Sequence, residues 1–316
     1  MAVFTKLLKE DIESFLKNYS IGNLLSYEGI VEGIENTNYK ITTSNNHYIL
    51  TIFEKRVNPS ELPFFMSLQK ELVTNGFDCP LPIENINGSI INPIKNKSAV
   101  IISFLDGKKL QSILPIHCKE VGSMIARFTN ITKTSKFKRE NGLNIETWEA
   151  IFNKCKETKD KSYDHYFNKL EHELSFLKNN WPTNLPKAII HADLFQDNIF
   201  FKEDKISGVI DFYFSCEDFI AYELALTINA WCFHLTEGFQ LKNYQSLIAG
   251  FNKHSSLNND EIKALNILLR GAAVRILVTR LHDKIYHPDD ALVIPKDPND
   301  YYKILEWHQK NNITDL

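Results

Sequence analysis

The sequence HADLFQDN, residues 191–198, followed by GVIDF, residues 208–212, decides the fold. These stretches belong to short β-branched or aromatic segments that the polar residues 203–205 divide, which is typical of a small hairpin. Asp193 falls on the loop before the hairpin, Asn198 follows it, and Asp211 is expected on the return strand. The pattern therefore predicts one proton acceptor and two oxygen ligands around a single point.

These residue types suit phosphoryl transfer to a hydroxyl group. Such a reaction needs a side chain that accepts the hydroxyl proton, and hard oxygen ligands that hold Mg²⁺ against the phosphates of ATP. Asp193 is the candidate base, and Asn198 and Asp211 are the candidate magnesium ligands. The spacing H-x-D-x-x-x-x-N also recurs by chance, but its place before a hairpin with a second acid favours catalysis. His191 has no second His or Cys at ligand spacing and is expected to bond the loop backbone.

The bulk composition predicts an ordinary folded protein of two units. The chain has 316 residues, of which 43% are hydrophobic and 24% charged. A net charge of −3 gives no field that attracts nucleic acid or an anionic membrane, so neither partner is expected. The five cysteines form no C-x-x-C pair, and neither a secretory signal nor a membrane-spanning segment is evident. We therefore expect a reduced, cytoplasmic protein.

The first hundred residues predict a sheet with one main helix. An amphipathic helix capped by Thr5 opens the chain, and residues 24–53 have the character of three antiparallel strands. Asn58 and Pro59 then mark the start of a second helix, which is followed by strand-like runs over residues 89–94 and 99–105. The pattern therefore predicts a five-stranded antiparallel sheet.

The remaining residues are mainly helical in pattern. The hairpin around residues 198–212 is the exception, so the fold class is α+β with a helical second unit. Helices are expected over residues 110–129, 145–156, 163–180, 218–235, 244–253, 260–282 and 301–309.

Several stretches carry a resemblance to a known family. They are residues 191–201, 210–216, 222–225, 229–233 and 270–281. The chain resembles the superfamily of aminoglycoside phosphotransferases and choline kinases, relatives of the protein kinases, and more narrowly the type II homoserine kinases. The resemblance implies a two-lobed protein-kinase-like fold with an N-lobe (residues 1–102), a hinge (103–107) and a helical C-lobe (108–316). It also implies ATP and Mg²⁺ as cofactors, and phosphorylation of L-homoserine on the route to threonine.

The nucleotide site follows from this resemblance. The hinge would bind adenine through backbone groups near Ser103 and Leu105, and the loop 32–38 would cover the phosphates with Asn36 and Thr37. Thr51 stands where the superfamily usually has a lysine that grips the phosphates. This departure puts an ion-pair role for Glu61 in doubt, and neighbouring Lys40 is an alternative cation or an ordinary exposed strand residue.

An amino acid substrate needs a cation for its carboxylate, and Arg suits that task best. Arg275 and Arg280 are the candidates, and the resemblance places Tyr213, Asn229 and Trp231 near the substrate beside Asp193.

Other interpretations stay open. Trp231 and Phe233 could instead form an aromatic surface for choline, and ethanolamine or an aminoglycoside is also compatible with the motif. Thr51 alone suggests a nucleotide-binding pseudokinase without turnover. The sequence leaves open whether the protein is a monomer or a homodimer.

Overall fold

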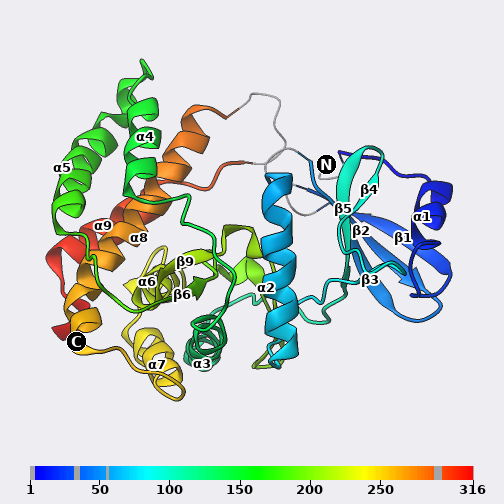
Figure 1. Ribbon diagram of the computed structural model, residues 1–316. Coiled ribbons are helices and arrows are strands. Elements are labelled where there is room, and N and C mark those ends of the chain that lie inside the picture. The colour runs from blue at the N-terminus through cyan, green and yellow to red at the C-terminus, as the bar shows by residue number, and fades with distance from the viewer. Residues whose placement is uncertain (1–3, 32–35, 55–56, 288–293, 316) are drawn as a thin grey trace. The chain divides into compact units, whose positions relative to one another are not determined.

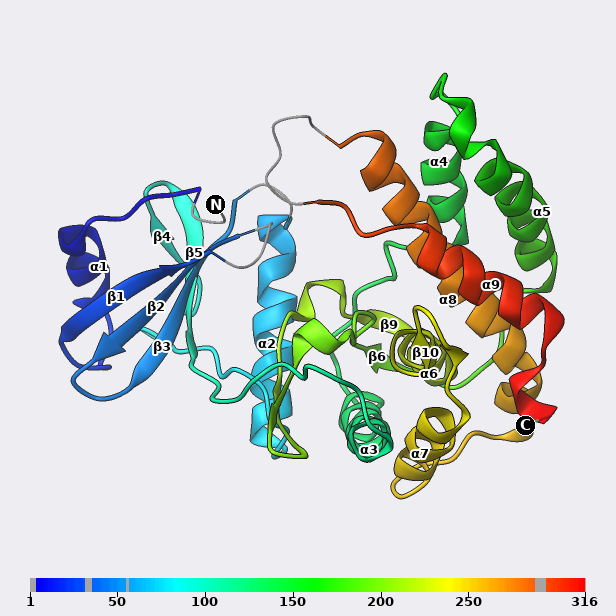
Figure 2. The same ribbon diagram turned by 180° about the vertical axis from the view of Figure 1, so that it is seen from behind.

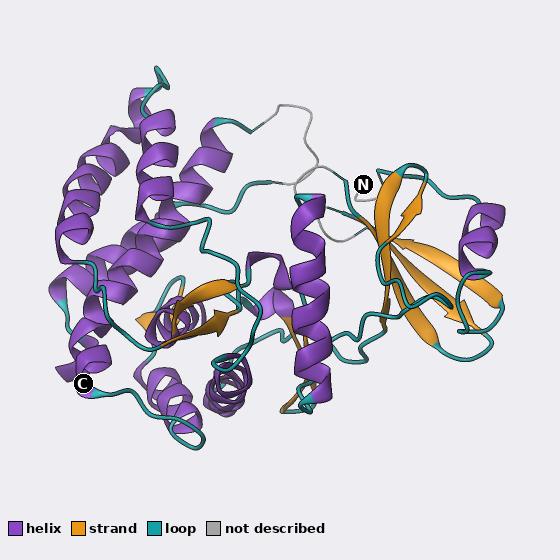
Figure 3. Ribbon diagram, viewed as in Figure 1, coloured by secondary structure: helices purple, strands orange, loops and turns teal. Residues whose placement is uncertain are grey.

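The computed structural model describes residues 4–31, 36–54, 57–287 and 294–315. The chain divides into two compact units, one rich in strands and one rich in helices (Figure 3), which confirms the α+β class. The predicted boundaries at residues 102 and 107 stay predictions. Unit 1 consists of Met1–Lys108, Phe200–Lys202 and Ser207–Tyr213, and unit 2 of Lys109–Ile199, Glu203–Ile206 and Phe214–Leu316.

Unit 1 contains the predicted five-stranded antiparallel sheet, in the order β1-β2-β3-β5-β4 (Figure 1). The run of β1, β2 and β3 confirms the three expected strands, and β5 lies between β3 and β4. The register sets Thr51 of β3 opposite Asn38 on one side and Val100 on the other. The strands are β1 (Leu24–Ile30), β2 (Thr37–Thr43), β3 (His47–Ile52), β4 (Asn92–Ile94) and β5 (Lys97–Ser103).

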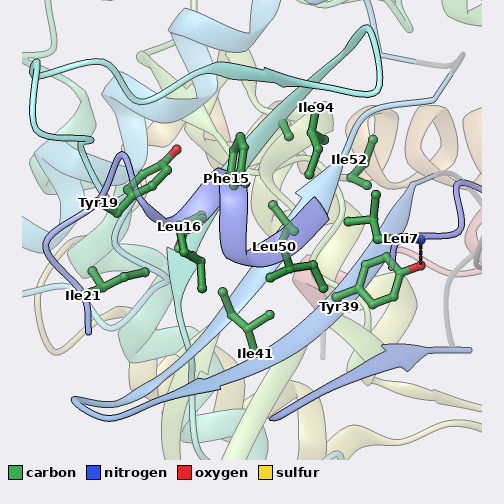
Figure 4. Packing of buried hydrophobic residues seen from close by; sticks show 13 residues of the cluster. Leu7, Phe15, Leu16, Tyr19, Ile21, Tyr39, Ile41, Leu50, Ile52 and Ile94 are labelled. Carbon is green, nitrogen blue, oxygen red and sulfur yellow. Dashed lines mark hydrogen bonds between the residues drawn. The ribbon is translucent and has the colours of Figure 1, made fainter. Parts of the chain in front are cut away.

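One face of this sheet is covered by α1 (Lys9–Leu16) (Figure 4). Burial of each large apolar side chain there contributes about 1.5–3 kcal/mol to stability. The Tyr39 hydroxyl accepts a hydrogen bond from the Leu7 amide at 3.0 Å and donates one to the Thr5 carbonyl at 2.9 Å. These bonds tie the segment before α1 to the sheet. Thr5 is therefore an anchor of that segment, and the helix itself begins after Leu8 rather than after Thr5.

The opposite face of the sheet is covered by α2 (Leu62–Thr74). Side chains alternate along a strand, so Val100 of β5 joins the α2 core while its neighbours Ala99 and Ile101 join the α1 core. The Tyr213 ring meets the rings of Phe53 and Phe65 edge-on, at 5.6 and 5.4 Å. This contact fixes Tyr213, which directly follows residues 208–212.

The entry to α2 follows the predicted capping chemistry with one difference. The Asn58 side chain accepts a hydrogen bond from the Ser60 amide at 3.1 Å, but the first turn is the 3₁₀ helix η1 (Pro59–Glu61). The α-helix then starts at Leu62.

Unit 2 is a helical assembly with two short antiparallel ribbons. Strand β6 (Lys187–Ile190) pairs with β9 (Cys216–Phe219), and β10 (Phe233–His234) with β11 (Gly238–Phe239). Helices α8 and α9 lie side by side (Figure 2), and α8 also packs on α6. The helices are α3 (Pro115–Thr132), α4 (Ile145–Cys155), α5 (Asp164–Asn180), α6 (Ile220–Trp231), α7 (Leu241–Phe251), α8 (Asn259–Ile285) and α9 (Asn299–Lys310).

Helices α3 and α7 approach closely through two glycines. A Cβ atom at Gly122 of α3 would lie 1.9 Å from the Leu247 carbonyl oxygen, and one at Gly250 of α7 would lie 2.0 Å from the Lys119 carbonyl oxygen. Both distances are far below van der Waals contact, so only glycine fits at these positions.

Several predicted helix boundaries were wrong, and two of them have a clear physical reason. The helix expected from residue 110 begins only at Pro115, a residue that favours the first helical position. The helix expected from residue 218 begins at Ile220, because the preceding residues form β9 on β6. Pairing with a strand distant in the sequence overrode the local pattern there.

The predicted hairpin is present as β7 (Ile199–Lys202) and β8 (Lys205–Val209). Of the hairpin residues, 200–202 and 207–209 belong to unit 1, whereas Ile199 and residues 203–206 belong to unit 2. Lys108 and Phe201 exchange two backbone hydrogen bonds of 2.9 Å, and the Val209 amide donates to the Asp78 carbonyl at 3.0 Å, so these hairpin residues belong to unit 1. The placement of Asp211 on the return strand was wrong, because β8 ends at Val209.

Candidate active site

The loop between β6 and β7 brings together two of the predicted catalytic residues. The 3₁₀ turn η3 (Gln196–Asn198) directs the Asn198 side chain back to Asp193. Its Nδ2 atom donates hydrogen bonds of 2.9 Å to Asp193 Oδ2 and to the Asp193 carbonyl oxygen. Asn198 is buried, so these bonds are shielded from water. Because the amide nitrogen is used on Asp193, the amide oxygen is the Asn198 atom that suits a Mg²⁺ ion.

A buried carboxylate on α6 supports the same loop. Glu223 is fully buried, and its Oε2 accepts a hydrogen bond of 2.8 Å from the Ala192 amide. Ala192 has φ of 62°, a left-handed conformation that costs an L-residue about 1–2 kcal/mol. A hydrogen bond to a charged group contributes about 1.5–3 kcal/mol and offsets this cost.

The environment of Glu223 also changes its acidity. Burial raises the pKa of Glu223 to about 7, although the backbone amides of Ala192 and His191 oppose that rise. Sequence analysis assigned no role to this residue. The available signal was an acid within an otherwise apolar helical run.

The end of α6 holds the loop from another side. The Trp231 indole Nε1 donates to the Leu194 carbonyl at 2.7 Å, and the Gln196 side-chain amide donates to the Ala230 carbonyl. Trp231 is almost fully buried. Its evident function is therefore to support the loop, and its contact with a substrate stays a prediction.

Asn229 links three helices of unit 2. Its Nδ2 donates to the Leu269 carbonyl of α8 at 2.9 Å, and its Oδ1 accepts from His308 Nε2 of α9 at 2.7 Å. Burial lowers the pKa of His308 to about 3, so the imidazole is neutral. Both polar groups of Asn229 are thus engaged within the protein, and its predicted role toward the substrate stays untested.

Asp211 and Tyr213 belong to unit 1, whereas Asp193 and Asn198 belong to unit 2. Asp211 has φ of 68°, a conformation rare for any residue with a side chain. Strained backbone of this kind concentrates at functional sites, which supports a special role for this aspartate. Its sharing of a metal ion with Asn198 stays a prediction.

The predicted phosphate-binding residues differ in their surroundings. Residues 32–35 of the expected loop lie outside the described residues. Thr37 accepts hydrogen bonds from the Phe4 and Thr5 amides at 2.9 and 3.0 Å and donates one of 2.6 Å to Glu54. Asn36 is buried, and its Oδ1 has no hydrogen-bond partner among the described residues. The Thr37 hydroxyl thus has a structural role, whereas Asn36 Oδ1 has no such partner in the part of the chain that the structure describes.

Thr51, at the position of the usual lysine, is buried in the sheet. Its hydroxyl donates a hydrogen bond of 2.8 Å to Asn38 Oδ1 on the neighbouring strand. Lys40 lies 3.6 Å from Glu28 and over the Phe104 ring. Lys40 is therefore engaged with groups of unit 1, and nothing in its surroundings marks it as a substitute for the lysine.

The backbone amide of Ser103, in the predicted hinge, is already hydrogen-bonded within unit 1. The Ser103 amide donates to the Leu81 carbonyl at 2.9 Å, and the Leu81 amide donates to Ser103 Oγ at 2.8 Å. Leu105 packs on Gly208 of β8, where a Cβ atom would lie 2.4 Å from a Leu105 methyl carbon. Adenine recognition at Ser103 would therefore use its carbonyl, and the position of Leu105 depends on a glycine.

Three arginines of α8 have different surroundings. Arg270 binds Glu173 through two hydrogen bonds of 2.6 and 2.8 Å. Arg280 donates to the Asp297 carbonyl at 3.0 Å and to Asp300 at 3.1 Å. Arg275 is only 2% exposed, and its Nε and Nη1 have no hydrogen-bond partner among the described residues. Of the two arginines proposed for a carboxylate, Arg280 already has a carboxylate partner, whereas Arg275 has buried donors without a partner among the described residues.

Unit 2 also contains a pocket of ≈ 600 Å³ that sequence analysis missed. It lies between the stretch before α3 and the end of α6, and its lining includes Leu110, Gln196, Trp231, Phe233 and Lys242. Gln196 and Trp231 also hold the loop that contains Asp193.

Within the described part of the chain, no group of three His, Cys, Asp or Glu side chains is arranged to hold a metal ion. A Mg²⁺ site in this protein would therefore also need amide oxygens and the phosphate oxygens of the nucleotide as ligands.

The described part of the chain contains no helix with the length and apolar character of a membrane span.

Comparison with known proteins decides the family. The model of the Phosphotransferase enzyme family matches residues 26–252, which is most of the chain. This chain belongs to the phosphotransferase enzyme family. The match includes the loop with Asp193 and Asn198 and ends before Arg275.

Relatives and solved structures agree with this assignment. A homoserine kinase of Parvibaculum lavamentivorans is 43% identical over 98% of this chain and 96% of its own length. The structure of amicoumacin kinase hAmiN with AMP-PNP, Ca²⁺ and Ami has a TM-score of 0.69 at 14% identity, over 98% of this chain and 94% of that one. The choline kinase of Cryptosporidium parvum has a TM-score of 0.68 at 16% identity, over 96% and 95%. The protein-kinase-like fold predicted from the sequence is therefore confirmed for this family member.

Proposed function

We propose that this protein is an ATP- and Mg²⁺-dependent homoserine kinase. The observation that carries the proposal is the 43% identity over nearly full length to a homoserine kinase. The Asp193–Asn198 pair, which phosphoryl transfer to a hydroxyl requires, supports it. The product is O-phospho-L-homoserine, the phosphoryl group being transferred from ATP with release of ADP.

Asp193 accepts the proton of the substrate hydroxyl as its oxygen attacks the γ-phosphorus. Asn198 Nδ2 donates a hydrogen bond of 2.9 Å to Asp193 Oδ2 and so orients the carboxylate. Glu223 and Trp231 fix the loop backbone on either side of Asp193. Preorganisation of this kind lowers the barrier because no group has to reorient during the reaction.

Asn198 and Asp211 are the residues that would hold Mg²⁺. Their amide and carboxylate oxygens are ligands that this ion prefers, so the donor set fits. The ion supplies charge neutralisation at the phosphates. For the nucleotide, we propose the Ser103 carbonyl and Leu105 as adenine contacts, with Asn36 near the phosphates and Thr51 behind them in the sheet.

Location and assembly are part of the same proposal. The protein acts in the cytoplasm on a small molecule, and no nucleic acid or membrane takes part. Either a monomer or a homodimer accommodates this activity.

A coupled assay of ADP release tests the substrate. L-homoserine, choline, ethanolamine, L-serine and kanamycin are compared, each with and without Mg²⁺. Turnover with homoserine alone, dependent on the metal, is the expected result. Turnover with choline or kanamycin in its place would assign another small alcohol, and ATP binding without any turnover would indicate a pseudokinase.

A further inference from the structure

A group of buried polar atoms without partners surrounds the middle of α8. It comprises Tyr222 Oη, Glu223 Oε1, Tyr301 Oη, and Nε and Nη1 of Arg275, and we call it the Arg275 cluster. None of these atoms has a hydrogen-bond partner of regular geometry among the described residues. Looser contacts join the Tyr222 hydroxyl to Arg275 and the Glu223 carboxyl group to the His191 amide. All four residues belong to unit 2. A buried donor without a partner costs about 1–3 kcal/mol, and more when it is charged, so such a concentration needs an explanation.

The nearby carboxylates do not satisfy Arg275. Asp218 uses Oδ2 on the Asn141 side-chain amide at 2.6 Å and Oδ1 on the Phe219 amide at 2.7 Å. Glu223 uses Oε2 on the Ala192 amide at 2.8 Å. The charge of Arg275 opposes the rise that burial causes in the pKa of both carboxyl groups, but neither group forms an ion pair with Arg275. Arg275 is therefore a buried cation that keeps hydrogen-bonding capacity for another anion.

The other arginines of α8 provide an internal comparison. Arg270 and Arg280 each form an ion pair with a carboxylate of the protein, at 2.6 and 3.1 Å. Arg275 is the most buried of the three, and its Nε and Nη1 have no hydrogen-bond partner among the described residues. Burying an unpaired charge is strongly unfavourable unless a partner arrives.

The Arg275 cluster lies next to the catalytic loop within unit 2. The charge of Asp193 raises the pKa of both the Tyr301 hydroxyl and the Glu223 carboxyl group, and the charge of Arg275 lowers it. The Tyr301 ring also contacts the Phe195 ring of the loop, with centroids 6.5 Å apart. Arg275 and the candidate base Asp193 therefore share Glu223 and Tyr301 as neighbours.

From these observations we propose that Arg275 binds the α-carboxylate of the amino acid substrate, with the Tyr222 and Tyr301 hydroxyls as further donors. The inference rests on the proposed homoserine kinase function and names the residue that selects an amino acid over an amino alcohol. Arginine is the side chain best suited to a carboxylate, and a desolvated charged contact discriminates strongly against a substrate that lacks the partner.

The Phe214 ring lies beside the guanidinium. Its centroid is 5.8 Å from Arg275 Cζ, and this ring is itself partly exposed. Because Arg275 is 2% exposed, the binding of a carboxylate requires a neighbouring side chain to move.

A variant-by-substrate comparison tests the inference. The kcat/KM of wild type and of Arg275→Gln is measured for L-homoserine and for 3-amino-1-propanol, which has the same hydroxyl and amine but no carboxylate. Loss of charged hydrogen bonds should lower kcat/KM for homoserine by about 10- to 150-fold, mainly through KM, and leave the aminopropanol value within about threefold. Wild type should prefer homoserine by a similar factor.

The outcomes separate the inference from the proposed function. An equal loss with both substrates would show a merely structural role for Arg275 and overturn the inference while the kinase function stands. Failure of wild type to phosphorylate homoserine would overturn both. Should Arg275→Gln fail to fold, Arg275→Lys keeps the charge and the stem but lacks the planar fork, and the same selective loss is expected, in smaller measure. Arg127→Gln, on the exposed side of α3, is the control for general effects of losing an arginine.

Discussion

Asn198 donates its side-chain N–H to Asp193 Oδ2 at 2.9 Å, so the candidate metal ligand also orients the candidate base. In the proposed mechanism this one side chain has two tasks, because its nitrogen donates to the carboxylate and its oxygen is the proposed ligand of Mg²⁺. The proposal therefore couples the position of the proton acceptor to that of the ion. A change at either residue should therefore disturb both.

Replacement of Asp193 by Asn tests the base without changing the shape of the loop. The variant keeps an oxygen for Asn198 Nδ2 but has no proton acceptor. We expect kcat to fall by about 10²–10⁴, equal to about 3–5 kcal/mol in the barrier, with the dissociation constant of ATP within about threefold of wild type. Steady-state kinetics and calorimetric titration with ATP measure the two effects. Unchanged kcat would exclude Asp193 as the base.

The raised pKa of Glu223 predicts that this residue destabilises the folded protein as the pH rises. Its pKa is about 7 in the folded protein and near 4.5 when unfolded, so between these values the folded state binds more protons. The contribution is fully present below about pH 4.5 and is lost as the pH rises through 7. It amounts to at most about 3 kcal/mol.

The variant Glu223→Gln removes this titration and keeps an acceptor for the Ala192 amide. We expect the difference between wild type and variant in free energy of unfolding to shift in favour of the variant from pH 5 to pH 8. Urea unfolding at a series of pH values measures it. A difference that does not change with pH would show that Glu223 keeps an ordinary pKa.

The contact between Asp193 and Asn198 and most of the sheet were predictable because local sequence determines them. The two residues are joined by a single turn, and β1, β2 and β3 are neighbours both along the chain and in the sheet. Asp211 was placed wrongly by two residues, since the end of a strand depends on where its partner ends.

Other features arise from contacts between distant residues. Strand β9 exists because β6 lies beside it, and Glu223 acquires its role from the Ala192 amide on another element. The distinction between Arg275 and its neighbours Arg270 and Arg280 depends on which carboxylates the fold brings near. Helical spacing alone contains none of this information.

Gly208 should control nucleotide affinity through Leu105. A Cβ at residue 208 would lie 2.4 Å from one Leu105 methyl carbon and 3.2 Å from the other, so Gly208→Ala must displace this side chain. Because Leu105 is the proposed adenine contact, KM for ATP should rise several-fold while KM for homoserine is nearly unchanged. Initial rates at varied ATP measure the effect. An equal rise in both constants would point to a general disturbance rather than to the hinge.

The close approach of α3 and α7 makes a prediction about stability alone. Alanine at Gly122 would place Cβ 1.9 Å from the Leu247 carbonyl oxygen, a backbone atom that cannot turn aside, so the helices must separate. Forced separation of packed elements typically costs 1–3 kcal/mol or more, and we expect at least ~2 kcal/mol in the free energy of unfolding. Gly142→Ala is the matched control, since nothing lies within 4 Å of a Cβ there and its backbone is not left-handed. Urea unfolding of both variants should show a loss for Gly122→Ala and at most a small change for Gly142→Ala. Equal stability of the two would mean that α3 and α7 do not meet through this glycine.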